Sequence, residues 1–191
     1  MKPKCKLASC TGRYEIEDET ESGEILFCCS NPTCTSKVDH RTLIFRYFID
    51  NGVNVYQWKR KCWNCSTITP IYSYFILYEL EKLDPFFSGC HGIGLGDVRF
   101  LDDIVIKKKT SVTIKRDREM RQYYAVNNCI KCGFKQGKNY VVDDPHEIWN
   151  DLNERLMEKK HSAFNIPISG RDKKFINELI LVLENNYGFE F

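Results

Sequence analysis

The spacing of the cysteines constrains the fold of this chain more than any other feature. Ten of its 191 residues are cysteines, and eight of them form four closely spaced pairs. These pairs are Cys5 with Cys10, Cys29 with Cys34, Cys62 with Cys65, and Cys129 with Cys132. A pair of thiolates on one turn can occupy two corners of a tetrahedral zinc site. The pattern therefore predicts two structural four-cysteine sites and two Zn²⁺ ions per chain.

The composition is typical of a folded protein, with 42% hydrophobic and 28% charged residues. The first six residues contain no apolar signal-peptide core, and no apolar run approaches the ~20 residues of a membrane helix. We therefore expect a cytoplasmic location and no membrane partner. In a reducing compartment, paired cysteines bind metal more often than they form disulfides.

The charges nearly balance, since 28 Lys and Arg face 26 Asp and Glu for a formal charge of +2. Eight thiolates and two Zn²⁺ ions add −8 and +4, which gives −2. Long-range attraction of the whole chain to a polyanion is not expected. A nucleic-acid partner therefore requires a local basic surface.

The first two pairs resemble a zinc ribbon, in which two cysteine turns at the bases of two hairpins surround one metal. Gly12 leaves room for backbone N–H groups that turn toward sulfur. Cys29 is the preferred ligand because Ser-Asn-Pro-Thr forms the turn to Cys34, and Cys28 is the alternate. Two alternative interpretations of these cysteines remain, which are a buried cluster without metal and adventitious disulfides.

The sequence Phe-Cys-Cys-Ser-Asn-Pro-Thr-Cys at residues 27–34 resembles the C-terminal zinc ribbons of bacterial type I topoisomerases. The resemblance covers about residues 4–37 and implies a zinc site. The first pair has a wider spacing than in that family, and the second turn is one residue shorter. In that family the ribbon binds single-stranded DNA. Six acidic residues between positions 15 and 24 would repel phosphate, so DNA binding is not transferred to this segment.

The other two pairs have the spacing of zinc knuckles but lie 63 residues apart. One shared site requires that residues 66–128 form a β-rich insert whose ends return to each other. A thioredoxin-type redox pair is an alternative, although Pro70 and its β-branched neighbours do not favour the helix that such a pair needs. Another alternative is a zinc-bridged homodimer.

The chain has one concentrated basic segment, which we expect on a protruding hairpin over residues 103–126. Cations and aromatic rings on a β-ribbon are typical of a nucleic-acid surface. A solvated hairpin whose lysines protect its edge is an equally open interpretation. The candidate nucleic-acid residues are Lys107, Lys108, Lys109, Lys115, Arg116, Arg118, Arg121 and Tyr123.

Evidence for an enzyme is weaker, and no familiar catalytic motif is present. The glycine-rich stretch 88–97 contains Cys90 and His91, which are candidates for chemistry, but it lacks a phosphate-binding lysine. A nuclease using Asp97, Asp102 and Asp103 is a further alternative. A non-enzymatic binding protein is preferred, and a protein-interaction module using the acidic segment or the C-terminal helices is the main competitor.

The predicted fold is α+β, with zinc-ribbon-type β modules, a β-rich insert and two C-terminal helices. Three modules are expected: a ribbon at 1–38, a split four-cysteine zinc module at 39–143, and a helical pair at 144–191. Within them, residues 39–52 are expected to form a helix, with a strand as the alternative. Strands are expected at 53–61, 68–80, 103–115 and 123–126, and helices at 144–156 and from about 169 to 188.

Overall fold

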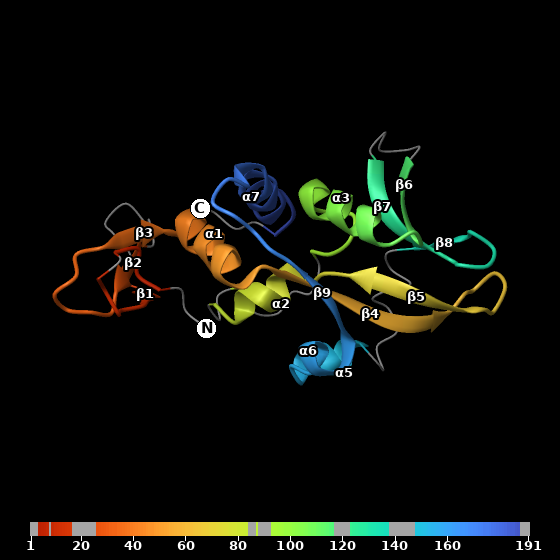
Figure 1. Cartoon of the computed structure of the whole chain (residues 1–191), viewed down its shortest axis with the longest axis horizontal. Helices are drawn as coiled ribbons and strands as arrows, with labels where there is room; N and C mark the ends of the chain where they lie inside the picture. Colours follow the sequence, from red (N-terminus) through yellow and green to blue (C-terminus); the bar gives the residue numbers. More distant parts are fainter. Residues whose placement is uncertain are drawn as a thin grey trace. The chain divides into compact units, whose positions relative to one another are not determined.

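The structure is a computed structural model of the whole chain, shown in Figure 1. It describes residues 4–7, 9–16, 26–83, 87, 93–116, 123–137 and 148–187. Helices occur together with three antiparallel three-stranded sheets, which confirms the α+β class. Among the described residues, no helix has the length and apolar character required to cross a membrane.

The three sheets are formed mostly by strands that are close in sequence. The first has the order β1-β2-β3, the second β5-β4-β9 and the third β6-β7-β8. Their strands are β1 (Tyr14–Ile16), β2 (Leu26–Cys29), β3 (Lys37–Asp39), β4 (Val53–Lys61), β5 (Ile68–Ser73), β6 (Val112–Arg116), β7 (Tyr123–Asn128), β8 (Lys135–Gln136) and β9 (Ser162–Ile166). The helices are α1 (His40–Asn51), α2 (Ile76–Glu81), α3 (Arg99–Lys108), α5 (Ile148–Asn153), α6 (Met157–His161) and α7 (Lys173–Tyr187).

The chain divides into two compact units, each assembled from separate segments. Unit 1 contains Met1–Gly52, Leu77–Cys90 and Pro167–Phe191, and unit 2 contains Val53–Ile76 and His91–Ile166. The predicted modules, by contrast, are continuous ranges of sequence. Each unit contains one set of clustered cysteines.

Unit 1 is organised around α1, whose ends match the sequence prediction. The Asp39 carboxylate caps the helix by accepting a hydrogen bond from the Thr42 N–H at 2.6 Å. Gly52 ends it with φ +67°, a conformation that favours glycine. Phe48 packs edge-to-face on Phe175 of α7, with ring centroids 5.4 Å apart. This contact joins two helices that are more than a hundred residues apart in sequence.

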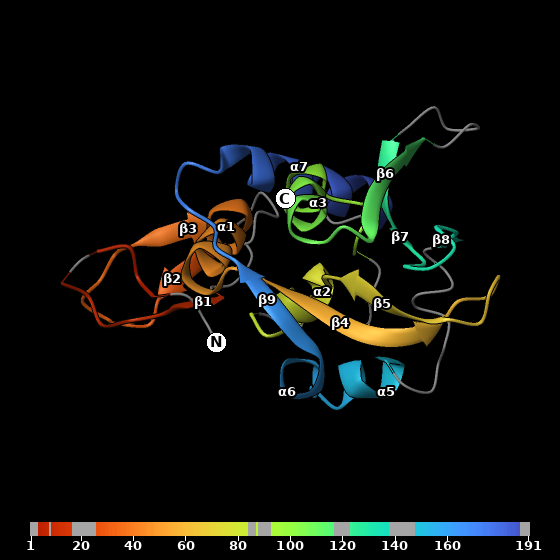
Figure 2. The same cartoon turned by 45° about the vertical axis from the view of Figure 1, so that its right-hand side comes forward.

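Unit 2 is built on the β4–β5 hairpin, which has β9 added to the other edge of β4 (Figure 2). The rings of Tyr56 and Trp58 pack near Phe75 in its buried core. Asn127 of β7 connects the third sheet to β5, because its side-chain amide donates to the Tyr72 carbonyl and accepts from the Tyr72 N–H, both at 2.9 Å. These polar contacts fix the position of the strand that leads to Cys129.

The predicted strand at 103–115 is wrong for its first half, which is the C-terminal part of helix α3. Val98, Leu101 and Val105 are buried at helical spacing. The β-branched run Ile104–Ile106, which suggested a strand, therefore lies in a helix. Helix α3 continues to Lys108, so the basic segment does not lie wholly on a hairpin.

Two other predicted elements also differ from the structure. The strand predicted at 68–80 ends at Ser73 and is followed by α2. The C-terminal region contains β9 between its helices. Of the helix predicted at 144–156, the structure shows α5, and the separate short helix α6 follows it. Residues 144–147, at the start of the predicted helix, lie outside the described residues.

Candidate metal centres

The first cysteine tetrad is formed by two short turns in unit 1. The Cys5 N–H donates to the Gly12 carbonyl at 2.9 Å, which closes the first turn. The Cys29 N–H donates to the Ser36 carbonyl at 3.1 Å, which closes the second. The sulfurs of Cys5, Cys10, Cys29 and Cys34 all lie within 4.8 Å of one another. Cys28, the alternate ligand, is not part of this cluster.

Gly12 is required by the geometry of this tetrad. Its N–H donates to the Cys10 Sγ at 3.4 Å. A Cβ atom at this position would lie 2.3 Å from the Cys29 Sγ, closer than two such atoms can approach. The predicted need for an unhindered backbone at Gly12 therefore has a specific cause, which is its close approach to the Cys29 sulfur.

The second tetrad is formed by two turns with the same backbone geometry. In the first turn, the Ser66 N–H donates to the Cys62 carbonyl at 2.8 Å, and the Cys62 N–H donates to the Thr67 carbonyl at 2.9 Å. In the second turn, the N–H of Gly133 donates to the carbonyl of Cys129 at 2.9 Å. Ser66 and Gly133, each four residues after the first cysteine of its turn, have positive φ values of 58° and 67°. Residues 66–128 therefore begin and end at matching turns, as one shared site requires.

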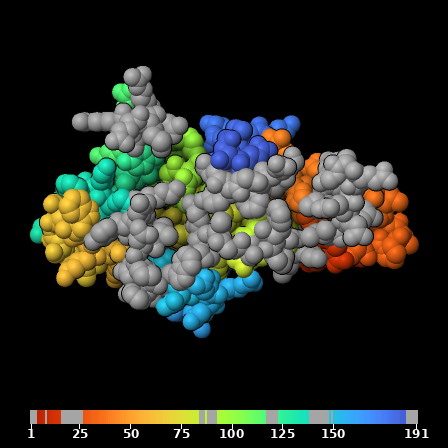
Figure 3. All heavy atoms as spheres, turned by 180° about the vertical axis from the view of Figure 1, so that it is seen from behind, coloured from red at the N-terminus to blue at the C-terminus, as the bar shows by residue number. Residues whose placement is uncertain are grey.

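The sulfur positions fit a tetrahedral metal ion. At a metal–sulfur distance of about 2.3 Å, the edges of a tetrahedron are about 3.8 Å long. The Sγ atoms of Cys62 and Cys132 are 3.7 Å apart, and those of Cys65 and Cys129 are 3.6 Å apart. In the first tetrad the corresponding distances are 3.6 Å for Cys5–Cys34 and 3.4 Å for Cys10–Cys29. Each tetrad can therefore hold one metal ion. Figure 3 shows the segments near residues 62 and 130 next to each other in unit 2.

Side-chain amides donate to the cysteine sulfurs in both tetrads. Asn31 donates to the Cys10 Sγ at 3.6 Å, and Asn64 donates to the Cys132 Sγ at 3.6 Å. The buried Gln136 amide donates to the Cys62 Sγ at 3.4 Å. Such donors stabilise negative charge on sulfur and orient the ligands. These three residues were not predicted from the sequence, although Asn31 and Asn64 lie between paired cysteines.

The thiols of each tetrad differ in how easily they ionise. Burial opposes ionisation of Cys5, but hydrogen bonds from the Leu7 backbone and from Cys34 lower its pKa to about 6. Hydrogen bonds from the Thr67 hydroxyl and backbone lower the pKa of Cys65 to about 6. Thiolates are the form that binds metal, so the lowered pKa values of Cys5 and Cys65 favour metal binding at each site.

The structure gives no support to the redox alternative for the second pair. Cys62 and Cys65 lie in a turn between antiparallel strands β4 and β5, not at the start of a helix. The nine cysteines within the described residues are free of disulfides. Both pairs of the second tetrad also come together within one chain, so this geometry needs no partner chain.

The candidate nucleic-acid residues separate into two groups. Lys107 and Lys108 end helix α3, and Lys109 follows it. The ammonium group of Lys108 lies 4.7 Å from the centroid of the Phe164 ring, and that of Lys109 lies 4.9 Å from the centroid of the Tyr72 ring. These two cations therefore already pack on aromatic rings of unit 2.

The second group lies on the β6–β7 hairpin. Lys115 and Arg116 are exposed on β6, and Arg116 pairs in register with Tyr123 of β7. The Tyr123 ring is 61% exposed, with the Arg116 guanidinium 6.0 Å from its centroid. Arg118 and Arg121 lie outside the described residues.

The carboxylates of the nuclease alternative do not converge. Asp97 accepts a hydrogen bond from the Gly94 N–H, and Asp103 pairs with Arg99 at 2.8 Å. Asp102 is buried, and burial raises its pKa to about 7. Within the described residues, the two cysteine tetrads are the only groups of three or more His, Cys, Asp or Glu side chains arranged to hold a metal. Cys90 and His91 lie outside those residues.

Comparison of the chain with protein-family models, with curated proteins and with solved structures gave no match. The function must therefore be argued from the tetrads and the surfaces near them.

Proposed function

We propose that this chain is a non-enzymatic protein that binds two structural Zn²⁺ ions and uses unit 2 to bind single-stranded nucleic acid. Zinc is favoured over other metals because all eight ligands are thiolates in near-tetrahedral sets. Closed four-thiolate sites leave no open coordination position for a substrate. The three-stranded sheet β1-β2-β3 next to the first tetrad supports a zinc-ribbon module there. We place the protein in the cytoplasm, where its thiols stay reduced.

The observation that carries the nucleic-acid proposal is the exposed Tyr123 beside Arg116 on the β6–β7 hairpin, with Lys115 exposed on the opposite face of β6. Exposed aromatic rings stack on bases, and neighbouring cations neutralise phosphates. These features favour a single strand, because its bases are accessible for stacking.

A further exposed ring lies at the second tetrad, which adjoins the Lys115 face of the hairpin. Lys115 lines a groove of about 330 Å³ together with Cys129 and Ile130, so the hairpin and the second knuckle adjoin. Trp63, in the other knuckle, is 50% exposed and packs edge-to-face on Phe134. Lys131 and Lys135 are exposed on the same tetrad. Trp63 is not among the candidate nucleic-acid residues predicted from the sequence, although its position between paired cysteines is a usable signal.

We expect the double variant Lys115→Glu/Arg116→Glu to lose at least about 10-fold in affinity for a labelled deoxythymidine 20-mer, because two phosphate contacts become repulsive. The negative slope of log K against log salt should become shallower by about 1.4 if both residues contact phosphates. Fluorescence anisotropy between 50 and 200 mM salt measures both quantities.

The single variants Lys115→Glu and Arg116→Glu are compared with Lys159→Glu, which reverses one exposed charge on α6. Lys159→Glu should bind like the unaltered protein. Equal affinities for all these variants, or no binding by the unaltered protein, would refute the nucleic-acid proposal. A protein partner would then be the better account.

A further inference from the structure

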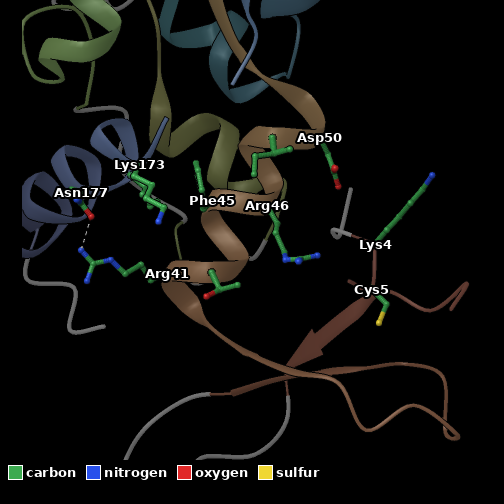
Figure 4. Close-up of a pocket in the computed structure, with 11 residues that line it drawn as sticks. Lys4, Cys5, Arg41, Phe45, Arg46, Asp50, Lys173 and Asn177 are labelled. Atoms are coloured by element: carbon green, nitrogen blue, oxygen red, sulfur yellow. Dashed lines mark hydrogen bonds between the residues drawn. The ribbon is translucent and has the colours of Figure 1, made fainter. Parts of the chain in front are cut away.

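Unit 1 contains a cavity of about 570 Å³ that the two metal sites do not explain. It lies on α1 and α7 beside the segment that carries Cys5 (Figure 4). Its apolar lining comes from Phe45 and Ile49 of α1 and from Ile176 of α7. The volume falls in the range of sites for small organic ligands, about 300 to 1,000 Å³.

The charged lining of the cavity is strongly biased toward cations. Lys4, Arg41, Arg46 and Lys173 line it, against the single carboxylate of Asp50. A zinc-loaded first tetrad would carry a formal charge of −2 near Lys4 and Arg46. Arg41 and Lys173 lie on the other side of α1 from Cys5 in Figure 4, so the tetrad does not account for their charge.

One arginine of α1, Arg46, is placed to receive an anion, whereas Arg41 extends to the other side of the helix (Figure 4). The Nε atom of Arg46 is buried and has no hydrogen-bond acceptor among the described residues. Leaving a buried, charged donor without an acceptor is costly in free energy, and a bound anion would remove that cost. Arg41 is held by a hydrogen bond from its guanidinium to the Asn177 Oδ1 at 3.2 Å, which joins α1 to α7.

We propose that this cavity binds the phosphate monoester of a nucleotide. Guanidinium groups match the geometry of phosphate oxygens, which favours phosphate over a monovalent anion. The cavity is much larger than a phosphate group, and its Phe45, Ile49 and Ile176 wall suits the flat apolar faces of a base. The same chemistry is present in a free mononucleotide and at the 5′-phosphate end of a strand.

The test is isothermal titration calorimetry of the zinc-loaded full chain with AMP and with adenosine. AMP should bind at least 10-fold more tightly than adenosine. Arg46→Met keeps an apolar stem but removes the charge, and it should weaken AMP binding at least 10-fold. Lys174→Met is the matched control, because Lys174 pairs with Glu178 and does not line the cavity. The proposal would be overturned if AMP and adenosine bound equally tightly. It would also be overturned if Arg46→Met and Lys174→Met lost the same affinity for AMP.

If Arg46→Met does not fold, the exposed Lys173 supplies the second variant. Lys173→Met should weaken AMP binding at least 3-fold, and unchanged affinity would contradict the proposal.

The Lys115→Glu/Arg116→Glu variant should bind AMP normally, so failure of the nucleic-acid proposal and failure of this one are distinguishable. In that double variant, tighter binding of a 5′-phosphorylated decamer than of its 5′-hydroxyl form identifies a strand end as the source. Equal binding of the two decamers, with AMP still bound, identifies the free nucleotide.

Discussion

The Cys129→Ser variant is expected to bind one Zn²⁺ ion instead of two and to lose the folded structure of unit 2. A serine hydroxyl is not a zinc ligand at neutral pH, so the second tetrad would keep three thiolates. Structural zinc in small modules contributes about 10 to 16 kcal/mol, as much as the whole stability of a typical domain. Native mass spectrometry gives the metal count, and ¹H–¹⁵N correlation spectra show which unit loses its dispersed signals.

Cys28→Ser is the matched control, since Cys28 lies on β2 next to a ligand but outside the first tetrad. It should keep both metal ions and an unaltered spectrum. Cys10→Ser should remove one ion and affect unit 1. The assignment of the ligands is wrong if Cys28→Ser loses a metal ion or if Cys129→Ser keeps two.

The second large effect concerns the buried carboxyl group of Asp102. Burial raises its pKa from 3.8 to about 7, although the Gly96 N–H and the Tyr74 hydroxyl donate hydrogen bonds to its Oδ1 at 3.0 and 2.9 Å. The folded state therefore binds more protons than the unfolded state between pH 4 and pH 7. In that window stability falls as the pH rises, and the loss is complete above the folded pKa.

We expect Asp102→Asn to stabilise unit 2 above pH 7, because the amide resembles the neutral carboxyl group in shape. The pKa difference sets an upper limit of about 4 kcal/mol for this gain. Between pH 6 and pH 8 the gain should grow by about 1 to 2 kcal/mol. Urea unfolding of the zinc-loaded protein at several pH values measures this difference.

Asp103→Asn is the neighbouring control, because Asp103 is a partly exposed residue paired with Arg99. It should show no gain that increases with pH. If Asp102→Asn destabilises the protein equally at pH 6 and pH 8, the carboxyl group is ionised in the fold throughout this range and the inference about its pKa is wrong.

Local patterns predicted the parts of this structure that depend on local chemistry. The eight clustered cysteines follow from their spacing. The helix expected at 39–52 is α1, with Asp39 and Gly52 as its capping residues. A short turn fixes where two sulfurs point, and a capping residue acts on its own helix.

The errors in the prediction arise where distant contacts decide the structure. The Ser162–Ile166 segment becomes β9 because it pairs with β4, about one hundred residues earlier. Asn127 and Gln136 depend on partners in other elements, so no local pattern identifies them. The strand prediction fails at α3 because the helical period of three to four residues runs directly into the β-branched residues of β6.

Metal content is the most direct test of the central claim, which is that two closed tetrads each hold one Zn²⁺ ion. The measurement is a native mass spectrum of the full chain purified under reducing conditions, compared with its denatured mass. We predict a mass increase that corresponds to two zinc ions per chain and no disulfide bond. A single ion, no ion, or a mass deficit from disulfide formation would contradict the account.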